Sequence, residues 1–160
     1  MSTALIIAIV AITFFAMEFV AWAMHKYVMH GFLWHLHADH HKKDHYNFLE
    51  RNDTFFLIFA IPSMLLFLAG SVYGMHLPWF WIGLGILTYG IAYFIVHEVF
   101  IHQRIKWLRR TKNPYFLAIR KAHKVHHKHL TKEDGECFGM LLVPWKYYRE
   151  AKRAQVAHRG

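Results

Sequence analysis

Histidine is over-represented in this 160-residue sequence, which contains 15 of them. Ten of the 15 belong to two spacing signatures, each of which occurs twice. The first signature is a pair five residues apart, and the second is a triplet spaced i, i+3 and i+4. In chain order the clusters are His25 and His30, then His37, His40 and His41, then His97 and His102, then His123, His126 and His127.

These spacings predict metal binding by imidazole side chains. On a helix, residues i, i+3 and i+4 lie on one face, so each triplet offers three ligands together. Residues i and i+5 lie about 140° apart on an α-helix, and they converge only where the helix unwinds or carries a π-bulge. Imidazole suits iron, copper, zinc or nickel. Ten ligands are too many for one ion, so we expect two metal ions.

Three apolar runs are expected to be the helices that position these clusters. Residues 4–24, 55–73 and 79–96 are each long enough to cross about 30 Å of hydrocarbon, and Glu18 is their only charged residue. Neither Lys nor Arg precedes the first run, which favours a retained span over a cleaved signal peptide. We therefore predict an all-α integral membrane helical bundle, organised as a single domain over residues 1–160.

A fourth membrane segment is expected to be re-entrant or interfacial rather than a full span. The apolar stretch Phe138–Trp145 is too short to cross the hydrocarbon and is expected to lie at the interface.

The distribution of charge predicts the orientation of the spans. The chain has 19 Lys and Arg against 10 Asp and Glu, a formal net charge of +9. Every basic residue follows either the first or the third run, which an odd number of spans places on one side. The positive-inside rule assigns that side to the cytoplasm, so clusters 25–41 and 97–127 are expected to form a cytoplasmic helical cap. This basic surface favours anionic lipid heads or an acidic protein over nucleic acid.

The four histidine motifs, HKYVMHG, HADHH, HEVFIHQR and HKVHH, resemble those of the bacterial β-carotene hydroxylases. These enzymes belong to the fatty acid hydroxylase superfamily of membrane di-iron proteins. The resemblance covers nearly the whole chain, including LERND before the second run and the pair Phe138-Gly139. The sequence departs from the pattern at the extra His35 and in the stretch HKHLTKEDGEC after the fourth cluster.

The resemblance implies O₂-dependent hydroxylation at carbon 3 of the β-ionone ring. β-Carotene would pass through β-cryptoxanthin to zeaxanthin, and canthaxanthin would give astaxanthin where 4-keto rings are accepted. It also implies two iron ions held by the ten histidines, with zinc able to occupy the purified protein. The expected location is the bacterial inner membrane, with the active site on the cytoplasmic side and the carotenoid arriving from the bilayer.

Electrons are expected to come from outside the chain. A single cysteine, Cys137, excludes an intramolecular disulfide and a cysteine-held iron–sulfur cluster, and there is no recognisable nucleotide motif. The expected donor is a ferredoxin or flavodoxin supplied by NAD(P)H.

Two alternatives stay open. A fatty-acyl or sterol hydroxylase or desaturase of the same superfamily would use the same ligands. A non-catalytic metal-binding membrane protein would need no redox chemistry, but it predicts ionisable residues spread along the spans, where only Glu18 is found.

Several residues near the clusters are candidates for a supporting role. A carboxylate beside a ligand can accept the second N–H of an imidazole. Glu18, an ionisable residue within a span, is expected to orient a ligand, to lie near the substrate ring or to be structural. The supporting candidates are Glu18, Asp39, Asp44, His45 and Glu98, with His35 and His129 as substitute ligands or supporting groups.

Aromatic residues at the span ends have two interpretations. They line the path of the substrate, or they anchor the helices at the membrane interface. The residues concerned are Trp22, Tyr27, Tyr93 and Phe94. The remaining histidines, His76 and His158, are expected to lie outside any site.

Overall fold

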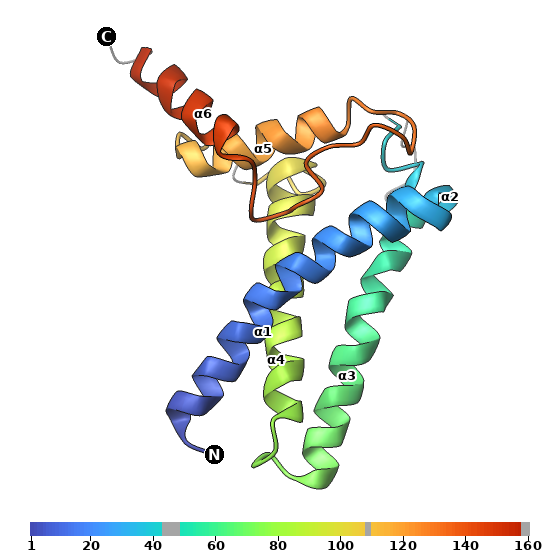
Figure 1. Cartoon of the computed structure of the whole chain (residues 1–160), viewed down its shortest axis with the longest axis vertical. Coiled ribbons are helices and arrows are strands. Elements are labelled where there is room, and N and C mark those ends of the chain that lie inside the picture. Colours follow the sequence, from blue (N-terminus) through green and yellow to red (C-terminus); the bar gives the residue numbers. More distant parts are fainter. Residues whose placement is uncertain (43–48, 108–109, 158–160) are drawn as a thin grey trace.

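Three long helices form the body of the molecule. The computed structural model describes residues 1–42, 49–107 and 110–157, and these ranges contain helices and irregular chain without β-strands. The long helices are α1 (Thr3–Ala23), α3 (Phe56–Tyr73) and α4 (Trp79–Phe94). α4 packs against both of the others, and α1 crosses it obliquely (Figure 1). The predicted all-α fold is confirmed for the described residues.

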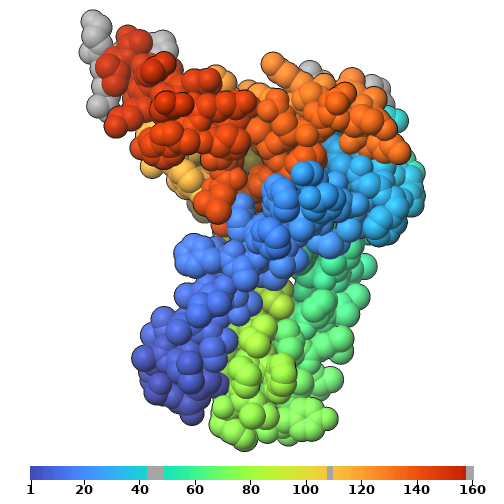
Figure 2. All heavy atoms as spheres, in the orientation of Figure 1, coloured from blue at the N-terminus to red at the C-terminus, as the bar shows by residue number. Residues whose placement is uncertain are grey.

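The shorter elements gather at the end of the bundle away from the N-terminus (Figure 1). With the loops between them they form what we call the cap, which is broader than the bundle on the face shown in Figure 2. Its elements are the π-helical segment η1 (Met24–Phe32), α2 (Trp34–His37), the 3-10 helix η2 (Arg51–Phe55), the π-helical segment η3 (Ile95–Ile101), α5 (Pro114–His126) and α6 (Trp145–Ala157).

α5 and α6 pack together through small residues. α5 begins at a side-chain cap, because Asn113 Oδ1 accepts the backbone N–H of Tyr115 at 2.9 Å. Ala118 and Ala122 of α5 are fully buried in a cluster with Tyr147 and Ala151 of α6. The small alanine side chains let the two helices lie close, which fixes the helix that carries the fourth histidine cluster.

The three predicted spans are confirmed. The stretches Thr3–Phe32, Arg51–Tyr73 and Trp79–Ile101 are long and apolar enough to cross a membrane, and each includes one predicted run. Large apolar side chains stay exposed on their outer faces, with Phe15 at 72% and Phe19 at 68% accessibility. A continuous apolar surface of this kind is stable against lipid rather than water. The protein is therefore a membrane protein.

Phe138–Trp145 does not form a span of its own. No fourth helix of sufficient length and hydropathy lies in the three described ranges. The segment is irregular up to Trp145, where α6 begins. Its amide groups at 140–142 instead bind Glu18 of α1, so the segment is fastened to the first span.

Both histidine pairs lie on π-helical turns, as the spacing of five residues requires. α1 continues into η1 and α4 continues into η3. At the end of η3, the backbone N–H of His102 donates to the carbonyl of His97, five residues earlier, at 2.9 Å. Because a π-turn bonds residue i to i+5, it brings both members of a pair onto one side of the helix. Of the two ways in which the pairs could converge, an unwound helix or a π-bulge, the structure has the second.

A glycine allows α1 and α4 to approach closely. A Cβ atom at Gly85 would lie 2.5 Å from the Cβ of Thr13 and 2.9 Å from the carbonyl oxygen of Val10. At Gly90 of the same helix, a Cβ atom would meet nothing within 4 Å.

We predict that Gly85→Ala destabilises the bundle by about 1–3 kcal/mol, because α1 and α4 must separate to admit the methyl group. Gly90→Ala is the matched control and should be neutral or stabilising by up to about 1 kcal/mol, since alanine favours helix. Thermal unfolding in detergent micelles measures both. Equal midpoints for the two variants would contradict the close contact at Gly85.

Candidate metal centre

Five histidines from three separate parts of the chain converge at one point in the cap. Their ring nitrogens lie within 4.8 Å of one another, and all five residues are buried. We call this group site A: His25, His30, His37, His41 and His126.

A second group lies beside the first. Four histidines offer ring nitrogens that are again within 4.8 Å of one another. His127 joins them, because its Nε2 lies 2.8 Å from the Nε2 of His123. The rings of His127 and His41 stack with centroids 4.7 Å apart, so the two groups are adjacent. We call the second group site B: His40, His97, His102, His123 and His127.

Each histidine triplet is divided between the two sites. His123 of α5 and His127, the residue directly after α5, belong to site B, whereas His126 of α5 belongs to site A. On a helix, i+4 lies about 40° from i in one direction and i+3 about 60° in the other, so neighbouring i+3 and i+4 side chains diverge. In the other triplet the i+3 residue is again the one set apart. His37 and His41 belong to site A, and His40 belongs to site B. The sequence placed each triplet on one face and did not predict this division.

Every histidine of site A holds its Nδ1 against an oxygen atom. Because carbonyl and amide oxygens only accept hydrogen bonds, Nδ1 carries the hydrogen and Nε2 turns its lone pair toward the centre of the site. The acceptors are Phe138 O for His25 (3.0 Å), Lys132 O for His30 (3.3 Å), Asn52 Oδ1 for His37 (2.7 Å), His129 O for His41 (2.8 Å) and Glu136 O for His126 (2.9 Å).

The distances between facing nitrogens fit a shared metal ion in each site. The Nε2–Nε2 separations between facing rings run from 3.1 to 3.3 Å in site A and from 2.8 to 3.1 Å in site B. Nitrogens bound at about 2.0–2.1 Å to one ion lie about 2.9 Å apart at right angles and about 3.4 Å apart in a tetrahedron. Lone pairs that face one another at such distances repel unless a cation lies between them. The donor set therefore fits two imidazole-bound metal ions.

Burial keeps these imidazoles in the form that binds metal. It lowers the pKa of His37 and of His126 to about 2, and that of His41 to about 4. Burial also lowers the pKa of His40 and of His123, and the neighbouring imidazoles add to the effect. A histidine must be neutral to act as a ligand, so the rings outside the spans are ready to bind at neutral pH.

The predicted supporting carboxylates have different contacts. Glu98 accepts a hydrogen bond from His97 Nδ1 at 2.5 Å. Asp39 accepts the backbone N–H of Arg51 at 2.7 Å. Asp44 and His45 lie outside the described residues.

Glu18 anchors the irregular segment that follows the fourth cluster. Its Oε1 accepts the backbone N–H groups of Met140, Leu141 and Leu142 at 3.0, 2.9 and 2.9 Å, and its Oε2 accepts the hydroxyl of Tyr89 at 2.8 Å. Phe138, in the same segment, accepts the hydrogen bond from His25. Glu18 therefore holds the segment whose Phe138 carbonyl accepts from His25, and both of its carboxylate oxygens are occupied by these contacts.

Sequence reasoning missed Glu50 and Asn52, whose side chains accept hydrogen bonds from the Nδ1 atoms of two ligands. Glu50 Oε2 lies 2.7 Å from His40, and Asn52 Oδ1 lies 2.7 Å from His37. Both residues belong to the LERND stretch. Its concentration of polar side chains directly before a span is the signal that could have found them.

The other histidines of the described residues, His35, His76 and His129, lie outside both sites. His35 is exposed on α2, and His76 is exposed between α3 and α4. His129 contributes its backbone oxygen to His41, while its ring lies 3.9 Å from a carboxylate oxygen of Glu136. His158 is not among the described residues.

The aromatic residues at the span ends divide into two kinds. The ring of Tyr93 lies 5.2 Å from the ring of His97, next to site B. Trp22 and Tyr27 instead surround the ammonium group of Lys26, which lies 5.2 Å from each ring centroid. Phe94 is half exposed on the outer side of α4. The grouping around Lys26 is typical of residues that anchor a helix at the membrane interface.

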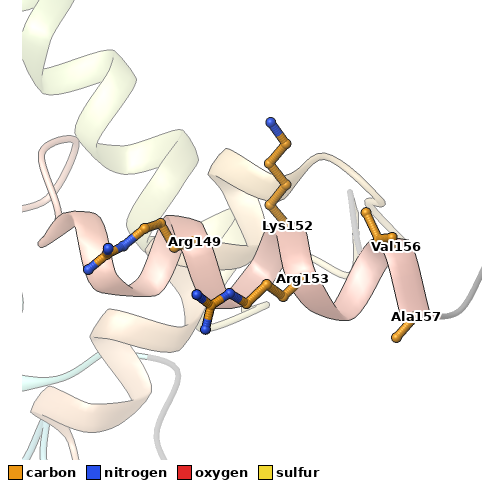
Figure 3. A pocket seen from close by; sticks show the side chains of 5 residues that line it. All are labelled: Arg149, Lys152, Arg153, Val156 and Ala157. Carbon is orange, nitrogen blue, oxygen red and sulfur yellow. The ribbon is translucent and has the colours of Figure 1, made fainter.

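A shallow hollow on the outside of α6 is lined by residues unrelated to the histidines. Figure 3 shows the basic side chains of Arg149, Lys152 and Arg153 extending from the helix, with Val156 and Ala157 beyond them. This surface is basic, and α6, the helix that carries it, lies at the end of the molecule away from the N-terminus (Figure 1).

Most of the chain matches a known family. Residues 10–148 match the family model described as fatty acid hydroxylase. The chain is 36% identical over 96 residues to a beta-carotene hydroxylase from Paracoccus sp. (strain PC1), which covers 60% of this chain and 58% of that protein. It is 40% identical over 95 residues to a beta-carotene hydroxylase from Pantoea ananas, which covers 59% and 53%. The match thus spans between about half and three fifths of these curated relatives, and no solved structure matches the chain.

We predict that the purified protein binds two metal ions per chain and that His37→Ala lowers this number toward one, because site A loses a ligand. His35→Ala is the matched control, since that side chain is exposed two residues earlier on the same helix. Elemental analysis after metal loading and desalting measures the content. Unchanged content in His37→Ala, or equal losses in both variants, would contradict the assignment of site A.

Proposed function

The chain belongs to the fatty acid hydroxylase family, and on this premise we propose that it is an O₂-dependent membrane hydroxylase acting on carotenoids. The proposed reaction is 3-hydroxylation of the β-ionone ring, from β-carotene through β-cryptoxanthin to zeaxanthin. A ring with a 4-keto group would be taken in the same way, from canthaxanthin to astaxanthin. The proposed cofactor is a pair of iron ions, one in each site.

The convergence of Nε2 lone pairs at two adjacent points carries this proposal. In site A, imidazoles that face one another at 3.1–3.3 Å with their hydrogens on the outward nitrogen need a cation to be stable, and the facing nitrogens of site B are as close. A protein that only transports metal would also need a polar path through the spans. Glu18 is the charged residue within the three predicted runs, and backbone amides and Tyr89 occupy its oxygens. These contacts favour an enzyme over the non-catalytic alternative.

The histidines would hold the metals while their partners fix the orientation of each ring. Hydroxylation consumes O₂, two electrons and two protons, places one oxygen atom in a C–H bond and releases the other as water. Activation of O₂ is the chemistry that bound iron would supply. The chain's own contribution is to fix, through Nδ1, the tautomer of the five ligands of site A and of His40 and His97 in site B, and to keep bulk water from the buried ligands.

The position of the sites favours a substrate that dissolves in the bilayer. Site A begins where α1 passes into η1, and site B begins where α4 passes into η3. A carotene is a water-insoluble rod whose end ring can reach these points from the membrane. Tyr93, beside His97, is positioned to contact that ring. The names of the similar Paracoccus and Pantoea proteins support a carotenoid rather than a fatty-acyl or sterol substrate.

The electron donor is proposed to be an external ferredoxin or flavodoxin supplied by NAD(P)H. α6 exposes Arg149, Lys152 and Arg153, a basic surface that complements an acidic protein or anionic lipid heads (Figure 3). α6 packs directly on α5, which carries ligands of both sites. A donor bound to α6 would therefore be one helix away from the metals.

The proposed location is the bacterial inner membrane with the cap in the cytoplasm. We predict that reporters fused at Ser2 and after Ala157 give opposite results, with the first periplasmic and the second cytoplasmic. Three membrane-capable helices and the positive-inside rule together support this orientation. A cytoplasmic result at both ends would contradict the arrangement of three spans.

We predict that the chain, expressed in bacteria that accumulate β-carotene, produces β-cryptoxanthin and then zeaxanthin. Each step inserts one oxygen atom into one of the two end rings, so the monohydroxylated pigment should appear first. Chromatography of extracted pigments, with and without O₂, measures the products.

His126→Ala should abolish turnover because it removes a ligand of site A, whereas the exposed His76→Ala should not change it. Unchanged β-carotene together with altered membrane fatty acids would leave a hydroxylase of this family and overturn the carotenoid assignment.

A further inference from the structure

Each site contains five histidines, but the sites differ in the groups that accept hydrogen bonds from the Nδ1 atoms of the rings. In site A, the Nδ1 hydrogens of all five ligands go to neutral oxygens. Four of the acceptors are backbone carbonyls, and the fifth is the side-chain amide of Asn52. No carboxylate oxygen takes part in these five hydrogen bonds.

In site B, two ligands are backed by carboxylates. His40 Nδ1 lies 2.7 Å from Glu50 Oε2, and His97 Nδ1 lies 2.5 Å from Glu98 Oε1. The side chains of both pairs are almost completely buried, with accessibilities of 1% and 8% in the first pair and 3% and 12% in the second. Two negative charges are therefore in direct contact with the ligands of site B and shielded from solvent.

Arg104 holds these carboxylates in place. Its Nη2 lies 3.1 Å from Glu50 Oε1, and its Nε lies 2.7 Å from Glu98 Oε2. It also binds Asp53 through two hydrogen bonds of 3.0 Å. The second oxygen of each supporting carboxylate is thus fixed, so the first stays aimed at its imidazole. With three carboxylates and one guanidinium, this cluster carries a formal charge of −2.

We propose that the two sites are inequivalent, and that site B binds a divalent metal ion first and more tightly than site A. This inference rests on the proposed metal-binding role of the histidines and deepens it. A carboxylate that accepts the Nδ1 hydrogen increases the electron density at Nε2, which makes the imidazole a better donor. The buried negative charge also attracts the cation, whereas the neutral carbonyls behind site A provide only partial charge.

The experiment is a titration of metal-free protein in detergent micelles with Co²⁺, followed by the visible absorption of the bound ion. We expect two steps of one ion each at different concentrations. His97→Ala should remove the tight step, and His25→Ala should remove the weak one, which identifies the sites. Because this measurement needs neither substrate nor electron donor, it is independent of the pigment assay.

Charge-removing variants then test the cause. Glu50→Gln and Glu98→Gln, made separately, keep an oxygen that can accept from the histidine but lose the charge. Each should weaken the tight step by about 10–100-fold and leave the weak step unchanged. Asn52→Asp places a carboxylate behind His37 and should strengthen the weak step. Asp39→Asn is the matched control, since Asp39 adjoins His40 in the sequence but contacts Arg51; it should change neither step.

Two results would overturn the inference while leaving the proposed function intact. One is a pair of steps with equal affinity in the unaltered protein. The other is a change of both steps by the same factor in Glu50→Gln, in Glu98→Gln and in Asp39→Asn, because net charge alone would then be responsible. If the folded protein bound no metal at all, the proposed function would fail together with the inference.

Discussion

The structure depends on keeping the lone pairs of buried imidazoles pointed at two small regions of space. Neutral rings in this arrangement repel one another, and the cap opposes that repulsion from outside. Each ring of site A is held by a hydrogen bond at its outer nitrogen. Most of the acceptors belong to residues 129–138, a segment with no regular secondary structure of its own. A stretch that looks like a connecting loop therefore sets the orientation of a metal site.

That loop is in turn fixed by the membrane bundle. Glu18 in α1 binds three consecutive amides just after Phe138, and Tyr89 of α4 binds the other oxygen of the same carboxylate. Unpaired backbone N–H groups are costly when buried, so this contact defines where the chain returns after the fourth cluster. The close packing of α1 on α4 at Gly85 keeps the two span ends at a fixed separation. The bundle is thus the frame on which both histidine pairs are placed.

Much of this arrangement is visible in the sequence, because it depends on local periodicity. The apolar runs predict the three long helices, and the spacing of His97 and His102 predicts that the helix departs from α geometry there, which the π-turn satisfies. The division of His126 from His127 depends instead on how α5 is rotated relative to two other helices. Asn52 and Glu50 act across tertiary contacts, and Phe138 acts through a backbone oxygen, which its residue type does not reveal. Local sequence patterns therefore predict which histidines are ligands. Tertiary packing determines which of them share a site and which groups accept their Nδ1 hydrogen bonds.

Each triplet places one of its histidines in the other site, and this determines when each site acquires its full set of ligands during synthesis. Site A contains four ligands from the first 41 residues, but its fifth is His126. Site B takes His40 from the early part of the chain and its other four ligands from residues 97–127. During synthesis, site A is complete only when the chain has passed His126, and site B only when it has passed His127. A nascent chain that ends at residue 41 has half of the ten ligand histidines and no finished site, so both sites are completed late and almost together.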